Sequence, residues 1–461
     1  MPTPDSTVTV VNPATERPVA DVKVQDTEEA DAVVRRAASA FPTWRDISAS
    51  DRARLLRRFA ARVEDHAEEL ALLETRNVGK PIADSRGEVA MVADVLHFYA
   101  GAVDKHRGAT IPVSGGVDLT LHEPLGVVVA IVPWNFPLAI TSWKVGPALA
   151  CGNTVVVKPA QLTPLTALRF AELALEAGLP EGVLQVVVGP GSSVGSFLVE
   201  HEVVAKVAFT GSTEAGRDVM ARAAGTIKRV TLELGGKSAN VVFADADLER
   251  AAASAPSAVF GNAGQDCCAR SRILVERCAF DRFVELFIAA TDSMVIGDPE
   301  DPGTDMGPLV SEGHRTDVAA FLDAPPEELP VAYRGRQRPG PGWWFAPTVV
   351  APAAPGTRLW RDEVFGPVVA VTPFDDEQDA ASLANDTPYG LSGSIWTRDG
   401  ARALRMARAV HAGVLSVNSN TSVRVNTPFG GMKQSGFGRE LGLEALDAYS
   451  EIKNVFLATD G

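Results

Sequence analysis

The chain has 461 residues, of which 46% are hydrophobic and 22% are charged, and this composition excludes a disordered protein. Its length predicts two or three domains. The net charge of −15 at pH 7 excludes the positive footprint that nucleic-acid binding needs.

The N-terminal third is predicted to be mostly helical. The predicted elements are a strand at residues 7–11, helices at residues 27–40, 51–74 and 88–106, and a strand at residues 119–123 that leads away from the globule. Thr27 is the expected cap of the first helix, because Glu28 and Glu29 then lie in its first turn.

From residue 125 onward the pattern changes to buried strands that alternate with helices. The predicted strands cover residues 127–132, 154–158, 184–188, 207–209 and 230–234. One intervening helix is capped by Thr163, has Pro164 at its first position and ends at Gly178, and another covers residues 212–224. Such alternation is typical of an α/β fold with a parallel, doubly wound sheet.

A second series of the same kind follows. Its predicted strands cover residues 239–243, 273–275 and 368–371, and residues 280–294 are predicted to be helical. The Gly- and Pro-rich residues 334–347 are expected to form a surface connection. The sequence therefore predicts a second α/β domain.

Cys267 is the first candidate for chemistry. It follows a glycine-containing turn, residues 261–266, and such a turn has the backbone freedom to present a thiol in a cleft. Taken alone, a free cysteine is more often a small buried hydrophobe. Asp266 and Cys268 flank it, and the negative charge of Asp266 disfavours the thiolate unless that side chain points away.

Two other segments make the catalytic interpretation stronger. Glu233 lies at the end of an apolar strand and directly before two glycines, where open α/β sheets place their ligands. Apolar neighbours raise the pKa of a carboxyl, which suits a general base. Asn135, between two prolines and two aromatic residues, is a candidate amide donor to an oxyanion. A solvated glutamate and a turn asparagine are the simpler alternatives.

Together these motifs resemble the aldehyde dehydrogenase superfamily, in its hydrolytic, CoA-independent branch. The resemblance runs from residue 12 to residue 453 and is carried most specifically by residues 233–237 and 264–267. Residues 209–212, 363–367 and 428–431 match further family motifs in the same order. The resemblance implies a Rossmann-type cofactor domain, an α/β catalytic domain and a β-arm for oligomerisation.

The resemblance also implies catalytic roles. Cys267 is the expected nucleophile, which forms a thiohemiacetal and then a thioester with the aldehyde, and Glu233 is the expected base that activates water to hydrolyse this thioester. The Asn135 amide and the Cys267 backbone N–H would form the oxyanion hole. Lys144 resembles a family lysine of the proton relay, and Glu440 a further acid near the water path.

For the cofactor, the resemblance implies a set of residues that bind NAD. These are Val132, Pro133, Trp134, Lys158, Gln161, Gly191, Gly195, Phe209, Gly211, Ser212, Leu234, Gly235, Glu363 and Phe365. Many NAD-preferring members have glutamate at the position of Gln161, where it repels a 2′-phosphate. A neutral amide removes that repulsion, so we expect NAD to be preferred and NADP to be tolerated.

Phe136, Trp143 and Phe429 match family positions that line the aldehyde tunnel, and such aromatic walls accept apolar or cationic groups. Arg424 falls in the loop near the tunnel mouth. As a carboxylate anchor it would indicate a semialdehyde substrate, whereas a solvated surface arginine is equally consistent with the sequence. An amino-aldehyde or betaine-aldehyde substrate is the other alternative.

Three rival functions fit parts of the sequence. Residues 191–195 fit the G-x-S-x-G nucleophile elbow of serine hydrolases, with His314 or His411 as the histidine, but this explains none of the other motifs. A CoA-acylating enzyme would not need Glu233 as a base. A non-enzymatic protein on the same scaffold would not need nucleophile, base and oxyanion donor. No metal site is predicted, because the seven histidines show no H-x-x-x-H spacing.

The expected organisation has three parts. Residues 1–104 and 125–235 would form the NAD(P)-binding domain, residues 236–434 the catalytic domain, and residues 105–124 and 435–461 the arm and C-terminal segment. Such an arm cannot bury its faces alone, so a homodimer or homotetramer is expected. Four cysteines in so long a chain, no leader pattern in residues 1–16 and no apolar run longer than residues 125–133 favour a cytoplasmic location without a membrane partner.

Overall fold

The computed structural model describes residues 6–323 and 329–459. A hairpin of β1 (Thr7–Asn12) and β2 (Arg17–Lys23) precedes four helices: α1 (Thr27–Asp46), α2 (Ala49–Asp65), α3 (Ala67–Val78) and α4 (Ile82–Ala102). The predicted helix at residues 51–74 is wrong as one element, because the chain breaks at His66 into α2 and α3.

The cap of α1 differs from the prediction. Asp26, not Thr27, is the N-cap, and its carboxylate accepts hydrogen bonds from the backbone N–H groups of Glu28 and Glu29 at 3.0 and 2.9 Å. The Glu29 carboxylate in turn accepts from the Asp26 N–H at 3.2 Å, which completes a capping box. Thr27 is thus the first residue of the helix.

The first large sheet has six strands in the order β17-β9-β8-β5-β6-β7. Its strands are β5 (Val127–Ile131), β6 (Thr154–Lys158), β7 (Leu184–Val186), β8 (Val204–Thr210), β9 (Arg229–Glu233) and β17 (Gly436–Phe437). All neighbours are parallel except β17, which pairs antiparallel with β9. The sheet confirms the predicted parallel α/β architecture.

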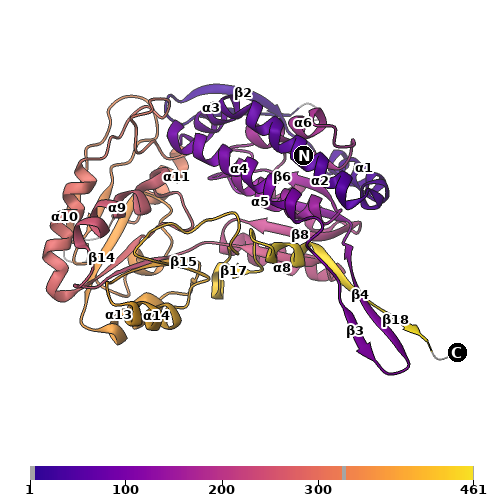
Figure 1. The fold of residues 1–461 in the computed structure, drawn as a ribbon. Coiled ribbons are helices and arrows are strands. Elements are labelled where there is room, and N and C mark those ends of the chain that lie inside the picture. Colours follow the sequence, from indigo (N-terminus) through magenta and orange to yellow (C-terminus); the bar gives the residue numbers. More distant parts are fainter. Residues whose placement is uncertain (1–5, 324–328, 460–461) are drawn as a thin grey trace.

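Helices cover both faces of this sheet (Figure 1). Its helices are α5 (Pro137–Ala150), α6 (Leu165–Glu176), the π-helical turn η1 (Gly191–Gly195), α7 (Ser196–Glu200), α8 (Thr213–Ala223) and the turn η2 (Ala224–Thr226). Along β5, Val128 packs in the core with α2 to α6, whereas Val127 and Val129 pack with α1, α7 and α8. Successive strand side chains point to opposite faces, so a continuous apolar strand serves two cores.

Of the two helix caps predicted around this sheet, one is present in the structure and the other is not. Ser212 caps α8 as expected, because its Oγ accepts from the Ala215 N–H at 3.2 Å. The expected Thr163 cap is wrong: α6 begins at Leu165 with Pro164 flanking it, and the Thr163 hydroxyl donates to the Trp134 carbonyl at 3.0 Å. Thr163 therefore holds the loop that follows β5, and it does not cap a helix.

The second large sheet has seven strands in the order β12-β13-β14-β11-β10-β15-β16, with only β12 antiparallel to its neighbour. Its strands are β10 (Ala239–Val242), β11 (Arg272–Glu276), β12 (Val331–Arg334), β13 (Thr348–Val350), β14 (Val368–Phe374), β15 (Ser392–Trp396) and β16 (Val414–Val417). Four of them, β12, β13, β15 and β16, were not predicted. The segment between β12 and β13 contains the predicted surface connection.

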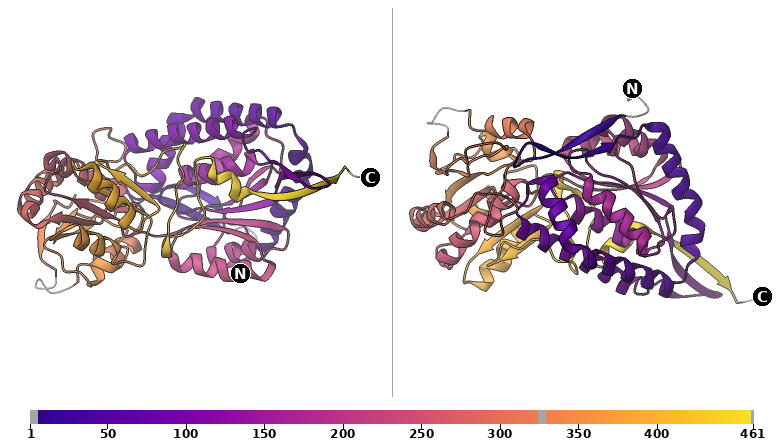
Figure 2. Two further views of the ribbon diagram at one scale, coloured as in Figure 1. Left: turned by 60° about the horizontal axis from the view of Figure 1, so that its bottom comes forward. Right: turned by 90° about the horizontal axis from the view of Figure 1, so that it is seen from above.

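Helices also pack around the second sheet (Figure 2). They are α9 (Leu248–Phe260), η3 (Gly261–Gly264), η4 (Arg277–Ala279), α10 (Phe280–Asp292), α11 (Glu312–Ala319), α12 (Arg358–Arg361), α13 (Glu377–Asn385) and α14 (Gly400–Ala409). The turns η5 (Lys433–Ser435) and η6 (Glu444–Tyr449) follow near the C-terminus. The core of this part is separate from the cores of the first sheet.

A three-stranded arm projects from the body (Figures 1 and 2). It consists of β3 (Thr110–Val113), β4 (Gly116–Pro124) and β18 (Ser450–Ala458), in the order β18-β4-β3. The arm exposes several large apolar side chains: Ile111, Val113, Leu121, Ile452, Val455, Phe456 and Leu457. Residues 1–5 and 460–461 of the expected N- and C-terminal segments lie outside the described residues.

Among residues 6–323 and 329–459, the structure contains no helix whose length and apolar character would let it cross a bilayer.

Candidate active site

A cavity of about 540 Å³ contains Cys267 and draws its walls from both large sheets and their helices. Glu233 at the end of β9 and Glu440 near the C-terminus line the same cavity. Most of the remaining wall is apolar, and its large members are Met91, Phe136, Ile140, Trp143, Leu234, Trp396, Val423 and Phe429. The structure thus brings the candidate thiol and the candidate base to the walls of one cavity.

The turn before Cys267 has an unusual backbone. Three successive residues, Asn262, Ala263 and Gly264, have φ angles of 49°, 56° and 72°, and the first two carry side chains that disfavour this left-handed region. Gln265 holds the turn, since its amide nitrogen donates to the Asn262 carbonyl at 2.9 Å and its amide oxygen accepts from the Val310 N–H at 2.9 Å. Gln265 therefore secures the conformation that presents Cys267.

The motif residues that are far apart in sequence meet behind the thiol. Gly236 lies so close to the Cys267 carbonyl that a Cβ at this position would collide with it. Gly264 lies equally close to the backbone of Gly366. These contacts explain why the segments that carry Glu233 and Glu363 contain glycine next to the cysteine loop.

The surroundings of Cys267 favour the neutral thiol. A hydrogen bond with the Cys268 thiol, followed by burial, raises the pKa of Cys267 well above its ordinary value. Asp266 does not point away, as one interpretation of the sequence required. Its carboxylate lines the cavity and accepts from the Cys268 N–H at 2.8 Å, and burial raises its pKa. The reactive thiolate therefore needs an environment that removes the proton before attack.

Asn135 is 3% exposed and is fixed against the cysteine loop. Its Nδ2 donates to the Gln265 carbonyl at 2.9 Å, and the Asn262 side chain donates to the Asn135 carbonyl at 3.1 Å. A side-chain amide nitrogen carries two hydrogens, so one remains after the bond to Gln265. The loop thus holds the Asn135 amide at the carbonyl of Gln265, which lies two residues before Cys267 in the sequence.

Glu233 is 4% exposed, and among residues 6–323 and 329–459 neither of its carboxylate oxygens has a hydrogen-bond partner. Burial, followed by the nearby charge of Glu440, raises its pKa well above its ordinary value. Its backbone is fixed on both sides by β8 and β17, and its carbonyl accepts from the Gly211 N–H at 3.1 Å. A rigidly held carboxylate with free lone pairs is suited to accept a proton from water.

Lys144, in α5, forms a buried ion pair with Glu440. The backbone of Glu440 makes two hydrogen bonds of 2.7 Å with that of Phe429, which fixes it at the cavity. One Glu440 oxygen has no hydrogen-bond partner within the described part of the chain. Glu233 and Glu440 thus form one wall of the cavity, and Lys144 is the buried cation paired with Glu440.

Several residues expected to bind the dinucleotide lie around the ends of β5 and β6. Lys158 is buried at the end of β6, and burial lowers its pKa to about 8. Its ammonium donates to the Pro159 carbonyl at 3.2 Å, and its carbonyl accepts from the Val132 N–H at 3.1 Å. Gly195 lies beside the Lys158 side chain. A buried cationic side chain with a single hydrogen bond fits a polar ligand such as a ribose.

A second group of these residues lies between the two sheets. The Glu363 carboxylate accepts from the Gly236 N–H at 2.9 Å and lies against Gly235, where a Cβ would collide with it. Burial raises the pKa of Glu363 to about 7. The backbone of Leu234 is held by the Ser435 carbonyl at 3.0 Å. Ser212, at the N-terminus of α8, supplies a helix end suited to phosphate oxygens.

The other expected cofactor residues are placed as follows. Phe209 is buried near the end of β8, Pro133, Gln161 and Gly211 are half-buried, and Gly191 is exposed at the start of η1. Trp134 and Phe365 pack edge to face with a centroid separation of 5.2 Å.

His314 is a residue of this region that the sequence did not identify as part of it. Its Nε2 donates to the Phe365 carbonyl at 2.7 Å, and its ring packs 5.1 Å from that of Trp134. Phe365 has a φ of 55°, so this bond supports an unfavourable backbone conformation. No spacing in the sequence connects His314 with residue 365, so only the packing reveals it.

Phe136, Trp143 and Phe429 line the cavity as expected, and the rings of Trp143 and Phe429 are 5.3 Å apart. The Arg424 side chain is exposed and is not among the residues that line the cavity, although Thr421, Ser422 and Val423 of the same loop are. Arg250, in α9, lines the cavity instead.

The sequence also missed two buried ionic groups beside the cavity. Glu88 lines the wall and pairs with Lys80, whose ammonium lies 4.3 Å from the centre of the Phe136 ring. Arg270 lies behind the cysteine loop, where it donates to the hydroxyls of Ser394 and Ser422 at 2.8 and 2.7 Å. The periodic pattern of the sequence predicts that Glu88 lies in a helix, but it cannot show that the side chain faces this cavity.

Comparison with known proteins identifies relatives along the whole chain. Residues 1–455 match the profile of the aldehyde dehydrogenase family. The chain is 41% identical to the NADP/NAD-dependent aldehyde dehydrogenase PuuC of Escherichia coli, over 99% of this chain and 93% of that protein. It is 43% identical to the phenylacetaldehyde dehydrogenase of Pseudomonas fluorescens, over 98% and 93%. The crystal structure of PnpE in complex with nicotinamide adenine dinucleotide superposes with a TM-score of 0.97, at 44% identity, covering 99% of this chain and 95% of that one.

Proposed function

We propose that this chain, which belongs to the aldehyde dehydrogenase family and is an NAD(P)-dependent aldehyde dehydrogenase, acts on aldehydes with an apolar substituent. It would oxidise them to the carboxylic acid through a thioester on Cys267. The observation that carries the proposal is the shared cavity: Cys267 and Glu233 line one space whose walls are mainly apolar.

The first half of the reaction belongs to the cysteine loop. The Cys267 thiol gives up its proton to a water molecule, and the resulting thiolate attacks the aldehyde carbon. The C=O π bond breaks, so the carbonyl oxygen becomes an oxyanion. The remaining hydrogen of the Asn135 amide and the backbone N–H of Cys267 stabilise this oxyanion. The bond from Asn135 to the Gln265 carbonyl orients the amide before substrate arrives, so no reorganisation is needed at the moment of attack.

The cofactor, when bound, supplies the acceptor for the hydride that leaves the substrate carbon. We assign its binding to the residues around Lys158, Gly195 and Ser212 for the adenosine and phosphate parts, and to Glu363 and Phe365 for the nicotinamide part. The partly satisfied Lys158 ammonium and the second Glu363 oxygen support this assignment. Since Gln161 carries no charge to repel a 2′-phosphate, we expect NAD to be preferred and NADP to be accepted.

The second half of the reaction belongs to Glu233. Its raised pKa and unpartnered oxygens support a role as the base that takes a proton from water, which then attacks the thioester. The Lys144–Glu440 pair lies behind it and is assigned to carrying that proton away. A base at this position favours water over CoA as the group that resolves the thioester.

The lining of the cavity supports the substrate class. Aromatic side chains from Phe136, Trp143, Trp396 and Phe429 surround the space beyond the thiol, and such walls favour an apolar or aromatic substituent. A cationic aldehyde is the second candidate, because the faces of the same aromatic rings attract a cation. Arg424 gives no support to a semialdehyde, since it is exposed outside the cavity.

The substrate and cofactor preferences are tested in one experiment. Purified enzyme is given NAD or NADP with arylacetaldehydes, linear alkanals, a trimethylammonium aldehyde and a succinic-type semialdehyde, and reduced cofactor is followed by absorbance. We expect the highest kcat/KM for the aryl and alkyl aldehydes, with NAD above NADP. Preference for the trimethylammonium aldehyde would support the second candidate, and preference for the semialdehyde or for NADP would contradict the proposal.

Replacing Asn135 by alanine is expected to lower kcat by a factor of about 10²–10³, the usual cost of one lost oxyanion donor. The loss should appear in kcat more than in KM, because the donor acts on charge that develops in the transition state. Steady-state kinetics test this, with unchanged circular dichroism as the folding control. An unchanged kcat would remove Asn135 from the oxyanion hole.

We also propose the three-part organisation and the oligomer. The proposed domain limits are residues 104, 125 and 235. At residue 104 the chain leaves the helical region for the arm, at residue 125 it enters the first sheet, and after residue 235 it enters the second sheet. The apolar residues that the arm exposes, among them Ile452 and Phe456, support assembly into a homodimer or homotetramer.

A further inference from the structure

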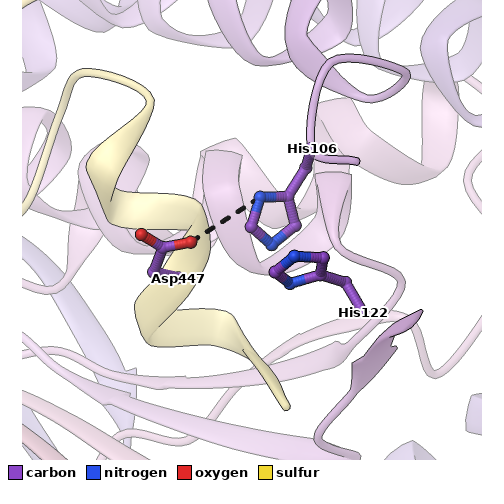
Figure 3. Close-up of side chains that lie close together, drawn as sticks. All are labelled: His106, His122 and Asp447. Atoms are coloured by element: carbon purple, nitrogen blue, oxygen red, sulfur yellow. Dashed lines mark ion pairs between the residues drawn. The ribbon is translucent and has the colours of Figure 1, made fainter. Parts of the chain in front are cut away.

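His106, His122 and Asp447 meet at the root of the arm, and none of them lines the cavity that contains Cys267 (Figure 3). His106 follows α4, His122 lies in β4 and Asp447 lies in η6, directly before β18. Figure 3 shows the two imidazole rings side by side with the carboxylate facing His106. One donor atom from each side chain lies within 4.8 Å of the other two.

The hydrogen bonds of Ser450 fix the orientation of both rings. Its hydroxyl donates to the Leu446 carbonyl at 3.2 Å, and its oxygen lies 2.8 Å from His106 Nε2 and 3.3 Å from His122 Nδ1. Because its single hydrogen is used, the serine oxygen accepts from both rings. A neutral His106 then carries its proton on Nε2 and a free lone pair on Nδ1.

That lone pair faces another acceptor. His106 Nδ1 lies 3.7 Å from an oxygen of Asp447, which is too long for a hydrogen bond. One ion bound to both at about 2.0–2.2 Å would subtend an angle of roughly 115–135°, somewhat wider than tetrahedral, between the two donor atoms.

From this geometry we propose that His106, His122 and Asp447 form a binding site for a divalent transition-metal ion of the Zn²⁺ type, which ties β4 to the start of β18. Two imidazoles and a carboxylate are ligands that such ions prefer. Small side-chain rotations bring the donors into the first coordination shell, and water takes the fourth position. This site rests on neither the catalytic roles nor the substrate class proposed above.

Two other side chains, those of Arg52 and Cys151, line the same small cavity, and neither is assigned as a metal ligand. The Arg52 guanidinium donates to the carbonyls of Arg45, Ile47 and Ala150, which hold this side chain in place. The Cys151 thiol donates to the Leu446 carbonyl at 3.6 Å, and burial raises its pKa to about 12. A neutral thiol is a weak metal ligand, so Cys151 is not assigned to the site.

The test is titration of chelator-treated, full-length enzyme with ZnSO₄ by isothermal calorimetry. Asp266, Cys267 and Cys268 also bring donor atoms within 4.8 Å of one another, so the wild type and a Cys267→Ala, Cys268→Ala background are both titrated. In both we expect one Zn²⁺ per chain at the arm, with a rise in Tm. His122→Asn and Asp447→Asn should weaken this binding by at least about tenfold.

His97→Asn is the matched control, because His97 is an exposed histidine of α4 that pairs with Glu64 outside the cluster. It should bind Zn²⁺ like the wild type. The Asp447 side chain is 74% exposed, so its replacement by asparagine tests the site without removing packed atoms. Equal Zn²⁺ affinity and stoichiometry in the wild type and in both ligand variants would overturn the proposal, as would the absence of binding in the background without the two thiols.

Discussion

Replacing Cys267 by alanine is expected to lower kcat for aldehyde oxidation by a factor of at least about 10⁴, because the covalent intermediate is assigned to this thiol. The cavity, the oxyanion donor and the cofactor residues all remain, so cofactor binding measured by fluorescence should be unchanged. The decisive measurement is the production of reduced cofactor with the best aldehyde of the panel.

Cys268→Ala is the matched control for this variant. Its thiol is hydrogen bonded to Cys267 and contributes to the raised pKa of the nucleophile. Without it, the pKa of Cys267 should fall toward its ordinary value, and the first turnover should be faster at neutral pH. If Cys268→Ala were as inactive as Cys267→Ala, or if Cys267→Ala kept its activity, the assignment of the nucleophile would be wrong.

Replacing Glu233 by glutamine is the second change with a large expected effect. We expect kcat to fall by about 10²–10⁴, because glutamine has the same shape but cannot take a proton from water. The thiol can still attack, so rapid mixing should show a burst of reduced cofactor followed by very slow turnover. Mass spectrometry of the stopped reaction should find the acyl group on Cys267.

The pH profile of the wild type gives an independent test of the same role. Burial and Glu440 raise the pKa of Glu233, so its basic form is populated only above the ordinary range for glutamate. As the pH rises through that pKa, the carboxylate forms and thioester hydrolysis should become faster. The rising limb in kcat should vanish in Glu233→Gln. Loss of the burst itself in that variant would instead assign Glu233 to the attack step.

The strands of the first sheet were the best predicted elements. Residues 154–158 were predicted as a strand and coincide with β6, because a continuous run of β-branched residues is buried on both faces of a parallel sheet. The strand β15, with the sequence Ser-Gly-Ser-Ile-Trp, was missed since its small polar residues carry no such signal. Its burial is imposed by its neighbours β10 and β16.

Helix boundaries were less well predicted, for a local reason. Thr27 and Thr163 both have the side chain of a cap, yet Asp26 caps α1 and Thr163 binds the Trp134 carbonyl. Residues with capping side chains occur in the sequence near the start of each helix, and the residue that acts as the cap depends on where the helix begins. That starting point is set by packing against the rest of the molecule.

By itself, the sequence determined the chemistry that this protein carries: a cysteine, a glutamate and an asparagine in motifs specific enough to identify the family and therefore the fold. Motifs of this kind are local, because a turn or a strand end needs particular residues at consecutive positions. Only the tertiary structure decided which side chains share a cavity or a cluster. Asp266 faces the Cys268 amide, Arg424 lies outside the cavity, and His106, His122 and Asp447 meet at the arm. Such contacts join residues that are up to hundreds of positions apart, and packing alone brings them together.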